Sequence, residues 1–132
     1  MPDVYITITD AAPALLEGLM TVLERRAADP QQRAMLHTYL TDAALPQEAR
    51  LLEVGCGTGA VTRVLATWPG VSETIGVDPS PVFVAKAREL AGRLSTATFQ
   101  EADGRSLPFA DDSFDAVRLS SILRSVTCQS QK

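Results

Sequence analysis

A glycine-rich turn between two apolar segments is the part of this chain best suited to hold a ligand. Residues 51–59 read Leu-Leu-Glu-Val-Gly-Cys-Gly-Thr-Gly. Gly55, Gly57 and Gly59 carry no Cβ and can adopt positive φ, so the chain can turn sharply and a ligand can lie against backbone N–H groups. An apolar strand that ends in such a turn and is followed by a helix is typical of a nucleoside-cofactor site.

The glycines by themselves fit two cofactors. Gly-x-Gly-x-x-Ala over residues 55–60 is a dinucleotide fingerprint, whereas Gly-x-Gly-x-Gly over 55–59 is that of methyltransferases that use S-adenosylmethionine (SAM). A dinucleotide brings a pyrophosphate, which the carboxylate of Glu53 would repel. SAM has no phosphate, and Glu53 can orient its cationic end directly or through water. Glu53 therefore favours SAM over NAD.

Two aspartates follow the turn at spacings that suit such a site. Asp78 lies about 20 residues beyond the turn, where a carboxylate can accept hydrogen bonds from the ribose hydroxyls of either cofactor. Asp103 ends the next strand-like segment and is placed to accept from the adenine amino group. An isolated aspartate more often caps a turn. Because both are in register with the glycine turn, we interpret them as binding residues.

The elements that must position these residues follow an alternating pattern. This order predicts an α/β fold, a Rossmann-like parallel sheet with flanking helices, in which ligands bind beyond the carboxyl ends of the strands. Glu53, Asp78 and Asp103 all fall at those ends. We expect strands at 51–54, 73–78, 97–102 and 114–120, with helices at 59–68 and 80–94.

Two amphipathic helices are expected before the sheet. The first ends before Pro30, which opens the second, and alternating residues 4–9 predict a short strand or extended arm. We therefore divide the chain into an N-terminal arm and helical lid or cap, residues 1–46, and a cofactor-binding domain, residues 47–132. The expected apolar faces are Leu16, Leu19, Met20, Leu23 and Ala27 in the first helix and Met35, Tyr39, Leu40 and Ala43 in the second.

Composition argues against several kinds of partner. The net charge is −4 and the basic residues are scattered, which disfavours nucleic acid and anionic membranes as partners. Cys56, Cys128 and the single histidine, His37, lack metal-ligand spacing, so we expect no metal. No segment reaches the roughly 20 apolar residues of a membrane span. We expect a soluble, cytoplasmic protein with reduced cysteines.

Three blocks of the chain form a recognisable set: residues 51–59, Ile-Gly-Val-Asp-Pro-Ser at 75–80, and Ala-Asp-Gly-Arg-Ser-Leu-Pro-Phe-Ala-Asp-Asp-Ser-Phe-Asp-Ala-Val at 102–117. The third block is the most specific, because Leu-Pro-Phe is followed by an aspartate and by Ser-Phe-Asp at the start of the fourth strand. Together the blocks resemble the class I SAM-dependent methyltransferases, and within that class the ubiquinone/menaquinone-biosynthesis type, methyltransferase domain type 11.

The resemblance implies a role for individual residues. Gly55, Gly57 and Gly59 would contact the methionine moiety of SAM, which Glu53 orients, while Asp78 holds the ribose. Asp103 and Gly104 would bracket the adenine edge, and Ser120 would line the methyl-transfer side. Leu107, Pro108 and Phe109 are expected to pack the loop rather than touch the cofactor. The remaining expected cofactor-binding residues are Cys56, Thr58 and Pro79, the first two chiefly through their backbone.

The resemblance covers about residues 35–127, the part that binds the cofactor, with strands 1 to 4 of the usual seven. The sheet is thus expected to be incomplete at its C-terminal side, and Arg118 stands where the family has an apolar residue. Strand 114–120 would then lie at the edge of the sheet, where its backbone N–H and C=O groups are unpaired. We expect a second copy, or the 4–9 arm of a neighbour, to cover that edge in a homo-oligomer; a truncated product is the equal alternative.

These observations predict a SAM-dependent methyltransferase that acts on an unidentified, small-molecule acceptor and releases S-adenosylhomocysteine (SAH). Methyl transfer is an in-line displacement that needs position and desolvation, so no catalytic residue is assigned. A non-catalytic SAM- or SAH-binding module is the alternative. An NAD-binding dehydrogenase domain is disfavoured by Glu53 and by the block at 102–117.

Overall fold

A five-stranded sheet forms the centre of the molecule. The computed structural model describes residues 13–110, 113–119 and 122–125. The strand order is β3-β2-β1-β4-β5, in which the first four strands are parallel and β5 is antiparallel to β4. The predicted α/β fold with its parallel sheet is therefore confirmed. The strands are β1 Ala49–Val54, β2 Val71–Asp78, β3 Ala97–Glu101, β4 Ala116–Leu119 and β5 Ile122–Ser125.

Two of the helices begin at side-chain caps. Asp29 precedes α3 and accepts from the backbone N of Gln32 at 3.1 Å. Ser80 precedes α5 and accepts from the backbone N of Phe83 at 3.2 Å. In both, proline follows the cap at the position where a missing N–H costs nothing. The helices are α2 Pro13–Ala28, α3 Pro30–Ala43, α4 Ala60–Ala66 and α5 Pro81–Ala91, which confirms both N-terminal helices.

Helices cover one face of the sheet and a loop covers the other. Leu51 of β1 packs with Leu65 of α4 and with the buried side of α3. On the opposite face, Val77 of β2 packs with Leu107 and Phe109 of the loop after β3. The prediction that Leu107 and Phe109 serve loop packing is confirmed, and the surface they pack against is the sheet.

The buried side of α3 differs from the predicted one. Leu36 and Leu40 are buried, whereas Met35 and Tyr39 are each 47% exposed. The prediction was therefore wrong for Met35 and Tyr39. Residues 36 and 40 lie one turn apart on the same helix face, and the docking of α3 turns that face toward the sheet.

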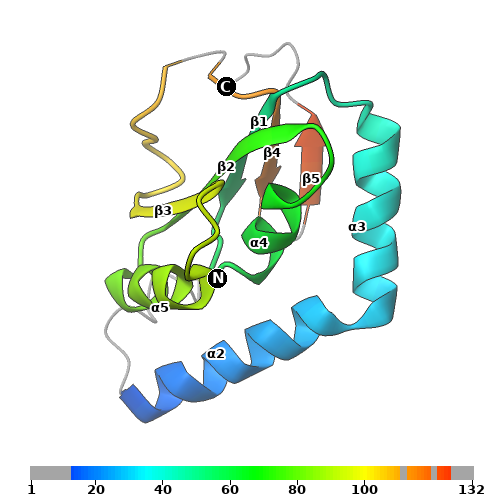
Figure 1. The fold of residues 1–132 in the computed structure, drawn as a ribbon. Helices are drawn as coiled ribbons and strands as arrows, with labels where there is room; N and C mark the ends of the chain where they lie inside the picture. The colour runs from blue at the N-terminus through cyan, green and yellow to red at the C-terminus, as the bar shows by residue number, and fades with distance from the viewer. Residues whose placement is uncertain (1–12, 111–112, 120–121, 126–132) are drawn as a thin grey trace.

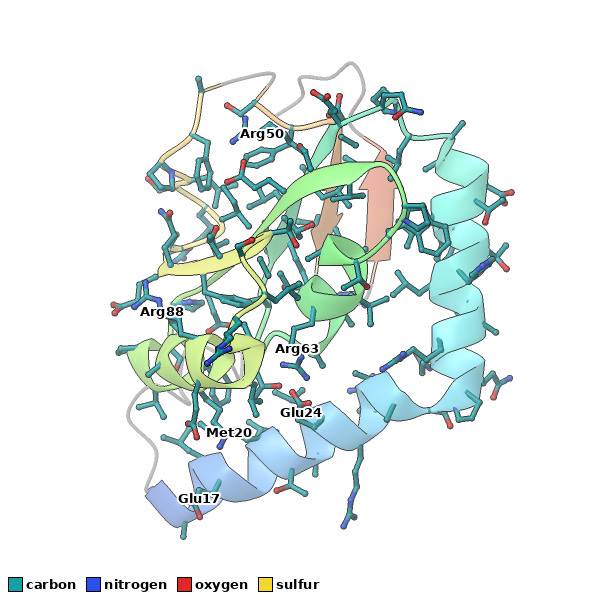
Figure 2. The ribbon with its side chains drawn as sticks, in the orientation of Figure 1. Glu17, Met20, Glu24, Arg50, Arg63 and Arg88 are labelled. Atoms are coloured by element: carbon teal, nitrogen blue, oxygen red, sulfur yellow. The ribbon has the colours of Figure 1, made fainter. Side chains whose placement is uncertain are left out.

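The start of β4 is fixed against β1 by Arg50 and the Ser-Phe-Asp block. The backbone N of Arg50 donates to Asp115 Oδ2 at 2.8 Å, and Arg50 Nη1 donates to the carbonyl of Ser113 at 2.7 Å. The guanidinium also lies 5.1 Å from the ring centroid of Phe114. Figure 2 shows Arg50 at this end of the sheet. These contacts help to set the register in which Glu53 faces Arg118.

The edge of β4 is covered within the chain. β5 pairs with β4 along residues 116–119, so the edge that we expected to be exposed at strand 114–120 is occupied. The outer strand on this side is β5. The homo-oligomer stays a prediction, and the 4–9 arm lies outside the described residues.

The two N-terminal helices meet in an L-shaped corner at Asp29 (Figure 1). Helix α2 lies across the end of the sheet region next to α4 and α5, where Leu16 and Met20 pack with Phe83. Helix α3 stands beside the sheet. Over the described residues, no helix has both the length and the apolar content to cross a membrane.

Candidate functional site

The glycine turn is held from inside by β2. The backbone N–H groups of Gly55 and Cys56 both donate to the carbonyl of Val77, at 2.8 and 2.9 Å. The N–H of Gly57 donates to Asp78 Oδ2 at 3.0 Å. Three N–H groups that could have faced a ligand are thus bonded within the protein. A ligand beside the turn would therefore contact the glycines and the neighbouring side chains rather than these three N–H groups.

All three glycines of this turn have a positive φ, and at Gly57 and Gly59 a Cβ would in addition lie close to a neighbouring side chain. Gly59 has a φ of 82°, and a Cβ there would lie 2.7 Å from the ring of Phe99. Gly57 has a φ of 57°, and its Cβ would lie 3.0 Å from Cδ1 of Leu23 in α2. A side chain would be strained at either position. The missing Cβ atoms therefore let α4 approach the sheet and α2 approach the turn.

A cavity of about 230 Å³ lies between this turn and the corner of α2 and α3. It is lined by the predicted residues Glu53, Gly55, Cys56, Gly57 and Thr58. The structure thus brings five predicted site residues to one space. The further lining side chains that bear charge are Arg26, Arg33 and Arg118.

Glu53 lies at the floor of this cavity in a buried cluster. Its Oε2 accepts from Arg118 Nη1 at 2.5 Å, and its Oε1 accepts from Thr62 Oγ1 at 2.5 Å. The Glu53 side chain is 3% exposed and that of Arg118 is 16% exposed. Burial raises the pKa of Glu53 to about 7, although Arg118 and Thr62 both act to lower it. Sequence reasoning marked Arg118 only as a departure from the family pattern, whereas the structure makes it the ionic partner of Glu53.

Asp78 ends β2 and ties the turn to α5. It is 1% exposed, and its Oδ1 accepts from the backbone N of Ser80 at 2.9 Å while Oδ2 binds Gly57. The capping role that we weighed for Asp78 is therefore present. A carboxylate oxygen can accept more than one hydrogen bond, so the predicted ribose contact is compatible with this arrangement.

Comparison with known proteins agrees with this geometry. A family model described as a methyltransferase domain matches residues 51–132. The chain belongs to the methyltransferase domain family. This confirms the family expected from the three sequence blocks, and it goes against the NAD-binding alternative.

The methyltransferase domain has similar relatives among curated proteins and solved structures. Demethylmenaquinone methyltransferase of Roseiflexus castenholzii is 40% identical over 86 residues, which is 64% of this chain and 35% of that protein. The protein of the same name from Roseiflexus sp. is 38% identical over 113 residues, 85% of this chain and 44% of that protein. The chain thus spans less than half the length of these curated relatives.

Among solved structures, the crystal structure of the YcgJ protein from Bacillus subtilis is similar to this methyltransferase domain. The TM-score is 0.57 at 35% sequence identity, over 66% of this chain and 37% of that one. The likeness supports the same Rossmann-like arrangement of sheet and helices.

Asp103 and Gly104, which we predicted to bracket the adenine, are not among the residues that line the cavity. Asp103 follows β3, and Arg105 binds both of its carboxylate oxygens, with Nη2 2.7 Å from Oδ2 and Nε 3.0 Å from Oδ1. These hydrogen bonds lower the pKa of Asp103 to about 2. Gly104 approaches β1 closely, because a Cβ there would lie 2.8 Å from Val54 Cγ1. Pro79 is half-buried beside Asp78, and Ser120 lies outside the described residues.

Cys56 is a structural residue of the turn. It is 7% exposed and free of any disulfide. Burial raises the pKa of the Cys56 thiol well above its ordinary value. Since the thiolate is the reactive form, burial disfavours a nucleophilic role for this cysteine. Among the described residues, no group of three or more His, Cys, Asp or Glu side chains is placed to hold a metal ion.

Sequence reasoning missed the residues that reach the turn from other elements. Thr62 was not singled out, although it is fully buried against Glu53. Glu24 of α2 and Arg63 of α4 were not singled out either, although both bind Thr58. No local pattern marks these residues, because each pairs with a segment at least five residues away and Glu24 with one 34 residues away.

Proposed function

We propose that this protein transfers a methyl group from SAM to a small-molecule acceptor. The observation that supports this most directly is the family match over residues 51–132, the part of the chain that contains the glycine turn and one wall of the cavity beside it. Because parallel strands β1, β2 and β3 are neighbours, Glu53, Asp78 and Asp103 share one edge of the sheet. That edge is where ligands bind in folds of this kind.

The charges around the cavity suit the methionine end of SAM. That end carries a carboxylate, an ammonium group and a sulfonium, so it needs both signs of charge. The cavity is lined by Glu53 and by Arg26, Arg33 and Arg118. Bound SAM would supply the methyl group from its sulfonium. The chain's own residues would bind it at Gly55, Gly57 and Gly59 and hold its ribose through Asp78.

The remaining predicted contacts complete the proposed cofactor site. Asp103 and Gly104 would bracket the adenine, which requires Arg105 to share or release the Asp103 carboxylate. No group of the described chain is assigned to proton transfer. The contribution of the domain is to position the donor and to exclude water from the transferring methyl group.

A quinol-type small molecule is the first acceptor to test. The curated relatives of both Roseiflexus species are named for demethylmenaquinone. We extend that class to this protein as part of the proposal. The homo-oligomer and the cytoplasmic location stay predictions.

Calorimetric titration with SAH, SAM and NAD tests the proposal. We expect saturable binding of SAH and SAM and no binding of NAD. Binding of NAD in place of SAH would overturn the cofactor assignment. Turnover of radiolabelled SAM with a demethylated quinol then separates an enzyme from the alternative, a module that binds SAM without transferring its methyl group.

A further inference from the structure

The acidic side chain of Glu24 connects helix α2 to the glycine turn. Glu24 Oε1 accepts from Arg63 Nη2 at 2.6 Å, and Glu24 Oε2 accepts from the hydroxyl of Thr58. Arg63 Nη1 also donates to the carbonyl of Thr58 at 3.1 Å. Figure 2 shows Glu24 and Arg63 pointing toward each other between α2 and α4. The three residues come from α2, the turn and α4, and each is bonded to the other two.

This cluster fixes the orientation of one peptide unit in the turn. Thr58 is 1% exposed, and both its hydroxyl and its carbonyl are bonded. The next residue, Gly59, donates its N–H to the carbonyl of Cys56 at 2.9 Å. The peptide between Thr58 and Gly59 is therefore held at both its oxygen and its nitrogen. Without the bonds to Glu24 and Arg63, the turn would be restrained by its hydrogen bonds to β2 and by the bond between Gly59 and Cys56.

A second contact of α2 lies one residue away. Leu23 Cδ1 lies 3.0 Å from the position of a Cβ on Gly57, so α2 lies directly over the turn. Leu23 and Thr58 both line the cavity beside the turn. Nearer the start of α2, Leu16 and Met20 pack against Phe83 of α5. The helix is thus seated at its first half by apolar packing and at its second half by the Glu24 cluster.

We propose that Glu24 and Arg63 are positioning residues for the glycine turn, and that they couple the docking of α2 to ligand binding at the turn. This inference rests on the proposed function. The two residues act through Thr58, since a ligand that lies against the turn depends on how the peptides at 57–59 are oriented. By linkage, a ligand that prefers this orientation strengthens the docking of α2, and loss of the cluster weakens the ligand.

The alternative is that Glu24 and Arg63 form a partly exposed ion pair that does not influence the turn. The side chains of Arg63 and Glu24 are 25% and 32% exposed, and pairs with such access to water often add little to stability. The test must therefore measure something other than stability. Binding of SAH, together with rescue by a conservative change, meets this requirement.

The experiment compares Glu24→Gln, Thr58→Val and Thr58→Ser with the control Glu17→Gln in the full chain. Glu17 is an exposed glutamate near the start of the same helix, away from the turn (Figure 2). We expect Glu24→Gln and Thr58→Val to raise the Kd for SAH about tenfold, within the usual range of coupling between sites. Glu17→Gln should stay within twofold of the original chain, and Thr58→Ser, which keeps the hydroxyl, should bind SAH more tightly than Thr58→Val.

Hydrogen exchange without ligand separates this inference from the proposed function. Glu24→Gln should speed exchange at the amides of residues 56–60, and Glu17→Gln should not. If the original chain does not bind SAH, the proposed function fails, while faster exchange at 56–60 still supports the positioning role. Unchanged exchange in Glu24→Gln overturns the positioning role, as does an unchanged Kd in a chain that does bind SAH. If Glu24→Gln does not fold, the Thr58→Val and Thr58→Ser pair gives the same decision.

Discussion

Two clusters of the same three residue types, Glu, Thr and Arg, lie near the glycine turn. Glu53, Thr62 and Arg118 lie inside the sheet domain, whereas Glu24, Thr58 and Arg63 join that domain to α2. The Glu53 carboxylate is 3% exposed and that of Glu24 is 32% exposed. The two clusters therefore share their functional groups but differ in how much of the carboxylate side chain is exposed to water.

The difference in exposure gives the two ion pairs different roles. A buried ion pair cannot lose one partner without leaving an uncompensated charge away from water. In a partly exposed pair, either side chain can exchange its partner for solvent at little cost. We therefore expect the Glu53 cluster to control stability and the Glu24 cluster to control the geometry of the turn.

The largest expected effect is that of Arg118→Met. It leaves Glu53 buried without its cation and should lower the free energy of unfolding by about 3–5 kcal/mol. Arg63→Met, the matched change in the other cluster, should lower it by about 1 kcal/mol or less. Urea denaturation measures both. The double variant Glu53→Gln with Arg118→Met should recover most of the loss, and equal losses from Arg118→Met and Arg63→Met would remove the distinction between the clusters.

The pH dependence of stability should carry the signature of Glu53. Its pKa is about 7 in the folded chain, against an ordinary value of 4.5, because of burial. Between these two values the folded chain binds the proton and the unfolded chain releases it, so this group makes stability fall as the pH rises through that window. Glu53→Gln should remove this part of the slope. Urea denaturation at about pH 5 and about pH 7.5 measures how the free energy of unfolding changes with pH. The same change in the original chain and in Glu53→Gln would contradict the prediction.

Two glycine substitutions compare the sheet domain with α2. Gly59→Ala places a Cβ against Phe99 at a φ of 82°, so clash and backbone strain should together cost about 2–4 kcal/mol. Gly18→Ala lies in α2 with nothing within 4 Å of the new Cβ, and should stabilise the chain by about 0.5–1 kcal/mol. Thermal melts read both. Gly70→Ala, with a φ of 87° and open space, isolates the backbone share of the Gly59 effect.

The smallest expected change in stability is that of Glu24→Gln. The amide can still accept a hydrogen bond from Thr58, and the lost charge is partly exposed, so the free energy of unfolding should fall by less than about 1 kcal/mol. A loss as large as that of Arg118→Met would mean that α2 belongs to the same cooperative core as the sheet. That result would be read from the same urea series.

Much of the fold follows from local patterns. The caps Asp29 and Ser80, each followed by proline, mark where α3 and α5 begin, and the alternation of strands and helices indicates the parallel sheet. The buried face of α3 was predicted less well. Met35 and Leu36 are equally apolar neighbours, so the sequence pattern did not decide which of them would meet the sheet.

Sequence alone determined the family, the glycine turn and the strand-end carboxylates Glu53 and Asp78, because these depend on short segments whose residue types restrict the backbone directly. Only the tertiary structure decided that Arg118 pairs with Glu53, 65 residues away, and that Glu24 reaches Arg63 across 39 residues. Such pairs depend on strand register and on helix docking. Both are set by packing between distant segments, which leaves no trace in the spacing of either partner along the chain.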